Sequence, residues 1–166
     1  MQLSINFPVI LTSLAAVVIG SSATFCSAQT TTPPDSVIME MAQAFKQKDS
    51  ARLTALLPTA RGHFLEPWAA YWELSPRLDR AAPTEIQAFF QRFAGTYQED
   101  RLRSEWLLQL GKRRDWANFS REYAQYRMQD EKSIQCYALL ADSTSNGTDN
   151  TALVKNLWLE IKETAD

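Results

Sequence analysis

The residues that could do chemistry in this chain of 166 residues are few. Cleavage of a sugar linkage needs a carboxyl group in an apolar pocket, where it keeps its proton near neutral pH. Glu73 and Glu105 each stand beside a tryptophan, Trp72 and Trp106, and are the candidate acids. Neighbours on a helix point about 100° apart, so an acid next to a core tryptophan usually faces water. We therefore predict no catalytic residue.

Other reactive groups are equally scarce. His63 is the only histidine and follows Gly62 in an expected turn, with no activating pattern nearby, so we expect a surface or interhelical histidine. One histidine and one cysteine, Cys136 of the mature part, cannot supply a zinc shell, and no run of carboxylates has calcium-loop spacing. Five glycines leave no phosphate-binding loop. The sequence predicts no metal and no cofactor.

The amino terminus predicts export. Residues 1–28 form a signal peptide by this reading, with an apolar run at Phe7–Ile19 and small residues that fit cleavage after Ala28. The first six residues carry no Lys or Arg, which leaves an uncleaved anchor as the alternative. A lipid anchor on Cys26 is disfavoured by the bulky Phe25 before it. We expect a periplasmic protein with no membrane contact after cleavage.

The mature part predicts one helical domain. Residues 29–34 are a polar, disordered lead-in, and residues 35–166 form the domain. A formal net charge of -2 argues against nucleic acid and against an anionic membrane surface, since both favour a basic face.

Hydrophobic spacing predicts eight short helices and no strand. Their expected starts are Asp35 or Ser36, Asp49 or Ser50, Pro67, Pro83, Gln98, Asp115, Ser133 and the end of the polar loop Ser143–Asn150. Short connections favour an all-α right-handed superhelix of antiparallel hairpins, an α-solenoid similar to tetratricopeptide arrays. Trp72 and Trp106 have the 34-residue spacing of such repeats, although Phe89 and Phe119 do not.

Aromatic residues are the remaining binding signal. Most of the five Trp, five Tyr and eight Phe have core spacing. Trp68, Tyr71 and Trp72 make a helix more aromatic than one packed stripe needs. Because aromatic faces stack on sugar rings, these three are the candidate glycan contacts.

Cys136 stands alone once Cys26 leaves with the signal peptide. A free cysteine is often a small buried apolar residue. Exported domains normally carry cysteine pairs, so a disulfide to a partner outside this chain is the other interpretation. Both interpretations stay open on the residues alone.

Several segments resemble, in order, the soluble lytic murein transglycosylases. Leu65–Trp72 resembles the family's L-x-P-Y-L-x-Y helix, and Leu102–Trp116 resembles its L-x-x-x-W-L-x-x-L-x-x-R-x-D-W pair. Gln135–Ala138 is similar to its C-x-Y helix, and Leu157–Leu159 to the L-W that follows. Ala42–Phe45 and Phe89–Phe93 match further helices of the family.

The resemblance implies the first portion of a superhelix that closes into a ring, with a lysozyme-like catalytic domain at its carboxyl end. Such enzymes cleave peptidoglycan glycan strands, so these strands and a separate catalytic domain are the expected partners. The family's catalytic glutamate precedes a serine, and no glutamate here does. The resemblance also implies that the disulfide partner of Cys136 lies past Asp166. The alternative function is a periplasmic, tetratricopeptide-like adaptor for a protein or peptide.

Overall fold

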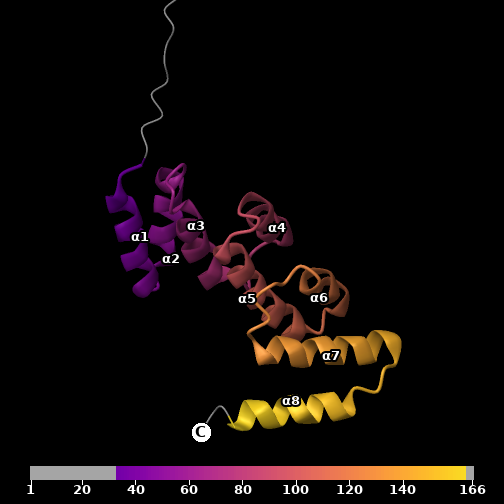
Figure 1. Ribbon diagram of the computed structural model, residues 1–166. Helices are drawn as coiled ribbons and strands as arrows, with labels where there is room; N and C mark the ends of the chain where they lie inside the picture. The colour runs from indigo at the N-terminus through magenta and orange to yellow at the C-terminus, as the bar shows by residue number, and fades with distance from the viewer. Residues whose placement is uncertain (1–32, 164–166) are drawn as a thin grey trace, which may run out of the picture. The chain divides into compact units, whose positions relative to one another are not determined.

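Every regular element that residues 33–163 contain is a helix, so the all-α prediction is confirmed. These are the residues that the structure, a computed structural model, describes (Figure 1), with side chains described to residue 159. The predicted signal peptide and residues 29–32 lie outside them. The elements are α1 (Asp35–Lys46), α2 (Ser50–Leu56), the 3₁₀ turn η1 (Leu57–Ala60), α3 (Glu66–Leu74), the 3₁₀ turn η2 (Ser75–Arg77), α4 (Pro83–Arg92), α5 (Tyr97–Arg113), α6 (Trp116–Tyr123), α7 (Lys132–Asn146) and α8 (Thr151–Glu163).

Side-chain caps fix the starts of three helices. Asp49 accepts a hydrogen bond from a backbone N–H at 3.0 Å, Thr96 at 3.2 Å and Asp115 at 3.3 Å, each three residues on. The predicted caps at Asp49 and Asp115 are therefore confirmed. The predicted cap at Asp35 or Ser36 is wrong, because Pro34 takes the cap position and makes no side-chain bond there.

The seventh helix runs further than its apolar residues predict. It continues through the polar segment after Ala141, so that only residues 147–150 separate α7 from α8. The Thr144 hydroxyl donates to the Leu140 carbonyl at 2.8 Å, and the Asn146 amide donates to Asp142 at 2.6 Å. These bonds run along the helix and do not compete with it, and Gly147 ends it with a φ of 67°.

Two groups of buried side chains hold these helices. The smaller joins α1, α2, η1 and α3, and the larger extends from α3 to α7. The Trp72 ring packs against both groups. Contacts between elements follow the chain: α1 packs on α2 and α3, α3 on α5, α5 on α6 and α7, and α7 on α8. In Figure 1, α7 and α8 lie side by side.

Gly111 allows the closest approach between two helices. It is a buried residue of α5, and a β-carbon at this position would lie 2.8 Å from the Cε2 atom of Tyr137 on α7. That separation is shorter than van der Waals contact, so the Tyr137 ring can lie here only because glycine has no side chain.

The last helix is less buried than its pattern predicts. Leu157 is buried, whereas Val154 and Trp158, which lie at helical spacing from it, are exposed. Within residues 33–163, no helix is both long and apolar enough to cross a bilayer.

Candidate functional site

The three aromatic residues singled out by the sequence all lie on α3, but they differ in exposure. Tyr71 is buried, whereas Trp68 and Trp72 are half-buried. The Trp68 ring centroid lies 5.8 Å from that of Trp72 and 5.9 Å from that of Tyr97, and Phe45 stacks on Trp72 at 6.2 Å. Much of each ring is therefore engaged in packing, and only parts of Trp68 and Trp72 face solvent.

Tyr97 is an aromatic residue of this cluster that sequence reasoning missed. It is the first residue of α5 and is half exposed, next to Trp68. The only feature of the sequence that could have indicated an exposed Tyr97 was its position outside the apolar stripe of α5. It enlarges the accessible aromatic surface beside α3.

Glu105 joins α3 to α5. Its carboxylate accepts a hydrogen bond from the Tyr71 hydroxyl at 2.6 Å and another from the Ser75 hydroxyl at 2.6 Å, and Arg101 lies 3.6 Å away. Burial, reinforced by the Glu105 carboxylate, raises the pKa of Tyr71. Tyr71 therefore stays a neutral donor at ordinary pH, and the carboxylate is held by fixed hydroxyl groups.

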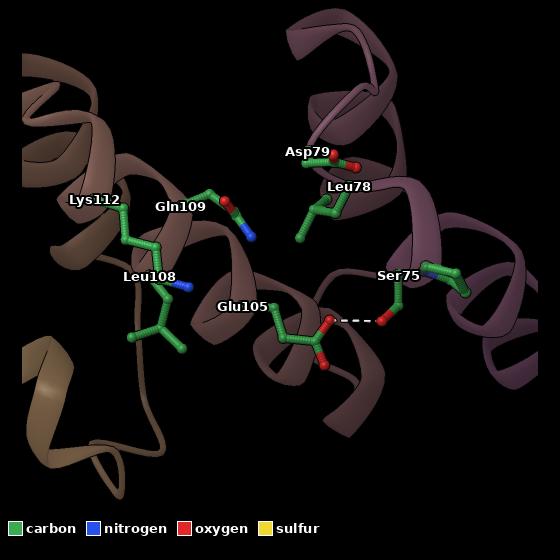
Figure 2. Close-up of a pocket in the computed structure, with 8 residues that line it drawn as sticks. Ser75, Leu78, Asp79, Glu105, Leu108, Gln109 and Lys112 are labelled. Atoms are coloured by element: carbon green, nitrogen blue, oxygen red, sulfur yellow. Dashed lines mark hydrogen bonds between the residues drawn. The ribbon is translucent and has the colours of Figure 1, made fainter.

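A polar cleft of about 490 Å³ opens beside this carboxylate (Figure 2). We call it the Glu105 cleft. In Figure 2 the Glu105 carboxylate points toward Ser75. Gln109 and Lys112 line the cleft from the same helix as Glu105, and Asp79 lies across the opening. Side chains of both charge signs line it. The three aromatic candidates are not among its lining residues, so the structure does not bring Glu105 and the aromatic contacts into one pocket.

Glu73, the other candidate acid, is buried in ion pairs. Arg77 donates to its two carboxylate oxygens at 2.8 and 2.7 Å, and Thr54 donates to one of them at 2.9 Å. Arg77 also pairs with Glu85, and this hydrogen bond lowers the pKa of the Glu85 carboxyl. The Glu73 carboxylate thus connects α2, α3 and η2.

A buried charge network, which sequence reasoning did not find, lies between α5 and α6. We use the term for Glu99, Arg103 and Glu122, all buried. The Arg103 Nε donates to Glu99 at 2.9 Å, and Arg103 also pairs with Glu122. The guanidinium carbon lies 4.1 Å from the centre of the Phe90 ring. The spacing of four between Glu99 and Arg103 was the available signal, but it is also typical of solvent-exposed helix pairs.

Asp100 fixes the segment that follows α6. Its carboxylate accepts hydrogen bonds from the backbone N–H of Arg127 at 3.0 Å and of Met128 at 2.7 Å. Asp100 lies in the first turn of α5, where a negative charge complements the helix dipole. The structure adds a long-range anchor, because a buried carboxylate needs donors to replace water.

His63 is buried and serves the fold. The backbone N–H of Leu65 donates to its Nδ1 at 3.0 Å, so in the neutral ring Nε2 carries the proton and donates to Asp35 at 2.8 Å. The ring therefore ties the start of α1 to the turn before α3.

Cys136 is half-buried and free among the described residues. Burial raises the pKa of its thiol, which slows reactions that need the thiolate. The only other cysteine of the sequence, Cys26, lies outside the described part of the chain.

No group of three or more His, Cys, Asp or Glu that could hold a metal ion occurs within the described part of the chain. Comparisons with protein-family models, with curated proteins and with solved structures find no match to this chain. The family resemblance therefore rests on the sequence motifs.

Proposed function

We propose that this chain is a helical scaffold of the soluble lytic murein transglycosylase type. In this proposal it forms part of a right-handed superhelix that holds the glycan strands of peptidoglycan. Bond cleavage falls to a separate catalytic domain. The chain is exported to the periplasm by residues 1–28 and cleaved after Ala28.

The contact between Gly111 and Tyr137 is the observation that carries this proposal. The two residues belong to two different segments of the family resemblance, the tryptophan helix and the C-x-Y helix, and they meet where α5 packs on α7. A side chain at position 111 would overlap the tyrosine ring. The helices that carry these two motifs therefore pack directly on each other, as consecutive parts of one scaffold would.

Other residues of the resemblance also serve helix packing. Leu102, Trp106 and Leu110 form the buried side of α5, and Asp115 caps α6. The proposal therefore assigns these motifs to the scaffold. It gives Glu73 and Glu105 no part in bond cleavage, because their carboxylates already accept hydrogen bonds that join helices.

Sedimentation with purified murein sacculi tests the proposal. We expect the full chain to pellet with sacculi and to release no anhydro-muropeptides into the supernatant. Protein that stays in the supernatant would contradict the glycan-binding role. Release of anhydro-muropeptides would contradict the assignment of cleavage to a separate domain.

A tetratricopeptide-like adaptor is the second candidate, and the surface of α8 favours it. Leu153, Val154, Trp158 and Leu159 are all exposed, and apolar side chains gathered on one helix suit a protein or peptide partner. A pull-down from periplasmic extract separates the two functions. An adaptor should retain a protein in the absence of glycan and lose it when Trp158 is changed to alanine.

A further inference from the structure

A second cleft of about 490 Å³ lies between α4 and the residues that follow α6. Three glutamines line it: Gln87 and Gln91, one turn apart on α4, and Gln125 beyond the end of α6. We call it the glutamine cleft. None of its lining residues belongs to the Glu105 cleft or to the aromatic cluster on α3.

The charges in this cleft are compensated within the protein. Arg103 and Glu99 of the buried charge network belong to its lining and pair with each other. Arg127, also in the lining, donates to Glu99 at 2.8 Å and lies 3.6 Å from Asp100. A charged ligand would gain little here, because each guanidinium already has a carboxylate partner.

The side-chain amides of the three glutamines, in contrast, have donors or acceptors that are free to bind a ligand. Gln87 donates through Nε2 to Glu122 at 2.7 Å, which orients its carbonyl oxygen as an acceptor. Gln91 and Gln125 are exposed, and their side chains make no hydrogen bond to another group within residues 33–159. An amide offers two donors and an acceptor on one flat group, which matches hydroxyl groups and other amides.

We propose that the glutamine cleft binds an N-acetylated sugar unit of a glycan. Such a unit is neutral and carries hydroxyls together with an acetamido group, so it complements an uncharged rim of amides. The cleft has the volume usual for small-molecule sites, about 300–1,000 Å³. Phe90 also belongs to the lining, but its ring is buried beneath the Arg103 guanidinium, so the amides are the groups that would recognise the sugar. This inference rests on the proposed function and gives it a location that no sequence motif marks.

Binding of a small soluble glycan to the full chain tests the cleft directly. The probe is the tetramer of N-acetylglucosamine, titrated by calorimetry or by NMR. Cellotetraose, which has the same backbone linkage without acetamido groups, is the matched ligand. We expect the N-acetylated tetramer to bind and cellotetraose to bind at least several-fold more weakly. Equal binding of the two, or no binding of either, would overturn the proposal.

Two variants assign the binding to the glutamines. We expect Gln91→Ala and Gln125→Ala each to weaken binding of the N-acetylated tetramer roughly three- to tenfold, the worth of one or two neutral hydrogen bonds. Both positions are exposed, so folding should be unaffected. Gln109→Ala, a glutamine of the Glu105 cleft, is the control and should bind as the unchanged chain does.

The outcomes separate this inference from the proposed function. Unchanged affinity in both Gln91→Ala and Gln125→Ala would place the sugar elsewhere and overturn the inference, while sedimentation with sacculi could still succeed. Selective tetramer binding that depends on the glutamines, without sedimentation, would support the cleft and contradict the murein scaffold.

Discussion

Two helices of this chain, α5 and α8, have similar apolar patterns and very different surroundings. Each carries a tryptophan at helical spacing from leucines, but Trp106 of α5 is 6% exposed and Trp158 of α8 is 58% exposed. Helix α5 packs on α3, α4, α6 and α7, whereas α8 packs chiefly on α7. Spacing predicts which side of a helix faces inward, and the number of neighbours decides how much of that side is buried.

The same two helices differ in their use of charge. Helix α5 buries Glu99, Asp100 and Arg103, and each has partners on other segments or one turn away. No charged side chain of α8 within residues 151–159 is buried. Charged groups tolerate burial only where neighbouring segments supply counter-charges or donors, so the buried charges mark the best-surrounded part of the fold.

Removing the central cation of α5 should have the largest effect. Arg103→Met removes the buried cation between Glu99 and Glu122, which then keep only Arg127 and Gln87, respectively, as side-chain donors named above, and it should lower the free energy of unfolding by about 3–5 kcal/mol. Urea denaturation measures the change. Arg80→Met is the matched control, because Arg80 is exposed and its nearest carboxylate oxygen is 3.7 Å away, and it should cost less than about 1 kcal/mol. Equal losses in both variants would mean that the buried charge network contributes no more to the free energy of unfolding than an exposed arginine does.

A tryptophan pair tests the comparison itself. Trp106→Ala should destabilise the fold by about 3–5 kcal/mol, since it opens a cavity among α5 and its neighbours. Trp158→Ala should cost less than about 1 kcal/mol, because the side chain is mostly exposed. Both values come from the same denaturation experiment. A loss at Trp158 as large as that at Trp106 would mean that α8 is covered in solution.

Gly111 offers a third test, of intermediate size. Gly111→Ala should lower the free energy of unfolding by about 1–3 kcal/mol, because the added methyl overlaps the Tyr137 ring. In a Tyr137→Ala background the same change should be neutral or stabilising, by up to about 1 kcal/mol, since alanine favours a helix over glycine. A double-mutant cycle by denaturation gives both values. Equal losses in the two backgrounds would show that the tyrosine contact does not set the effect.

Changing Tyr126 should have the smallest effect on stability at neutral pH. Its contribution to stability changes only at alkaline pH. Burial and then the hydrogen bond to Asp130 raise the pKa of Tyr126 to about 12 from 10.0. Below pH 10 the phenol is neutral in both states and its contribution is complete. As the pH rises from 10 towards 12, only the unfolded chain loses the proton, so stability falls.

Tyr126→Phe should show a shallower loss of stability over this alkaline range. Parallel denaturation curves for the two proteins check this, and tyrosinate absorbance follows the ionisation. Identical slopes between pH 10 and 12 would show that Tyr126 ionises as an exposed tyrosine does.

Local signals predicted much of the fold. Apolar spacing identified eight helices, and the caps at Asp49 and Asp115 follow from residue type. These features depend on a few neighbouring residues. The cap at Asp35 failed because Pro34 takes the cap position, and the extent of α7 was missed because a polar run can stay helical through hydrogen bonds between its own side chains and backbone.

The site could be predicted only in part, because it depends on distant residues. Tyr71 was expected to present an aromatic face, but it is buried and donates to Glu105, 34 residues away. The partners of Arg103 include Glu122, 19 residues away. The glutamines of the second cleft have no motif at all, because glutamine is common on exposed helix faces. They come together only because α4 and the residues that follow α6 lie on either side of the cleft, which the sequence alone does not show.

Sedimentation of two proteins with murein sacculi tests the central claim most directly. The account holds that ion pairs between charged side chains stabilise the helix packing. The glutamine amides of the glutamine cleft that are not used in that packing bind the glycan. We expect the unchanged chain to pellet with sacculi and the Gln91→Ala/Gln125→Ala double variant, at equal stability, to remain largely in the supernatant. Equal pelleting of both proteins, or no pelleting of either, would contradict the account.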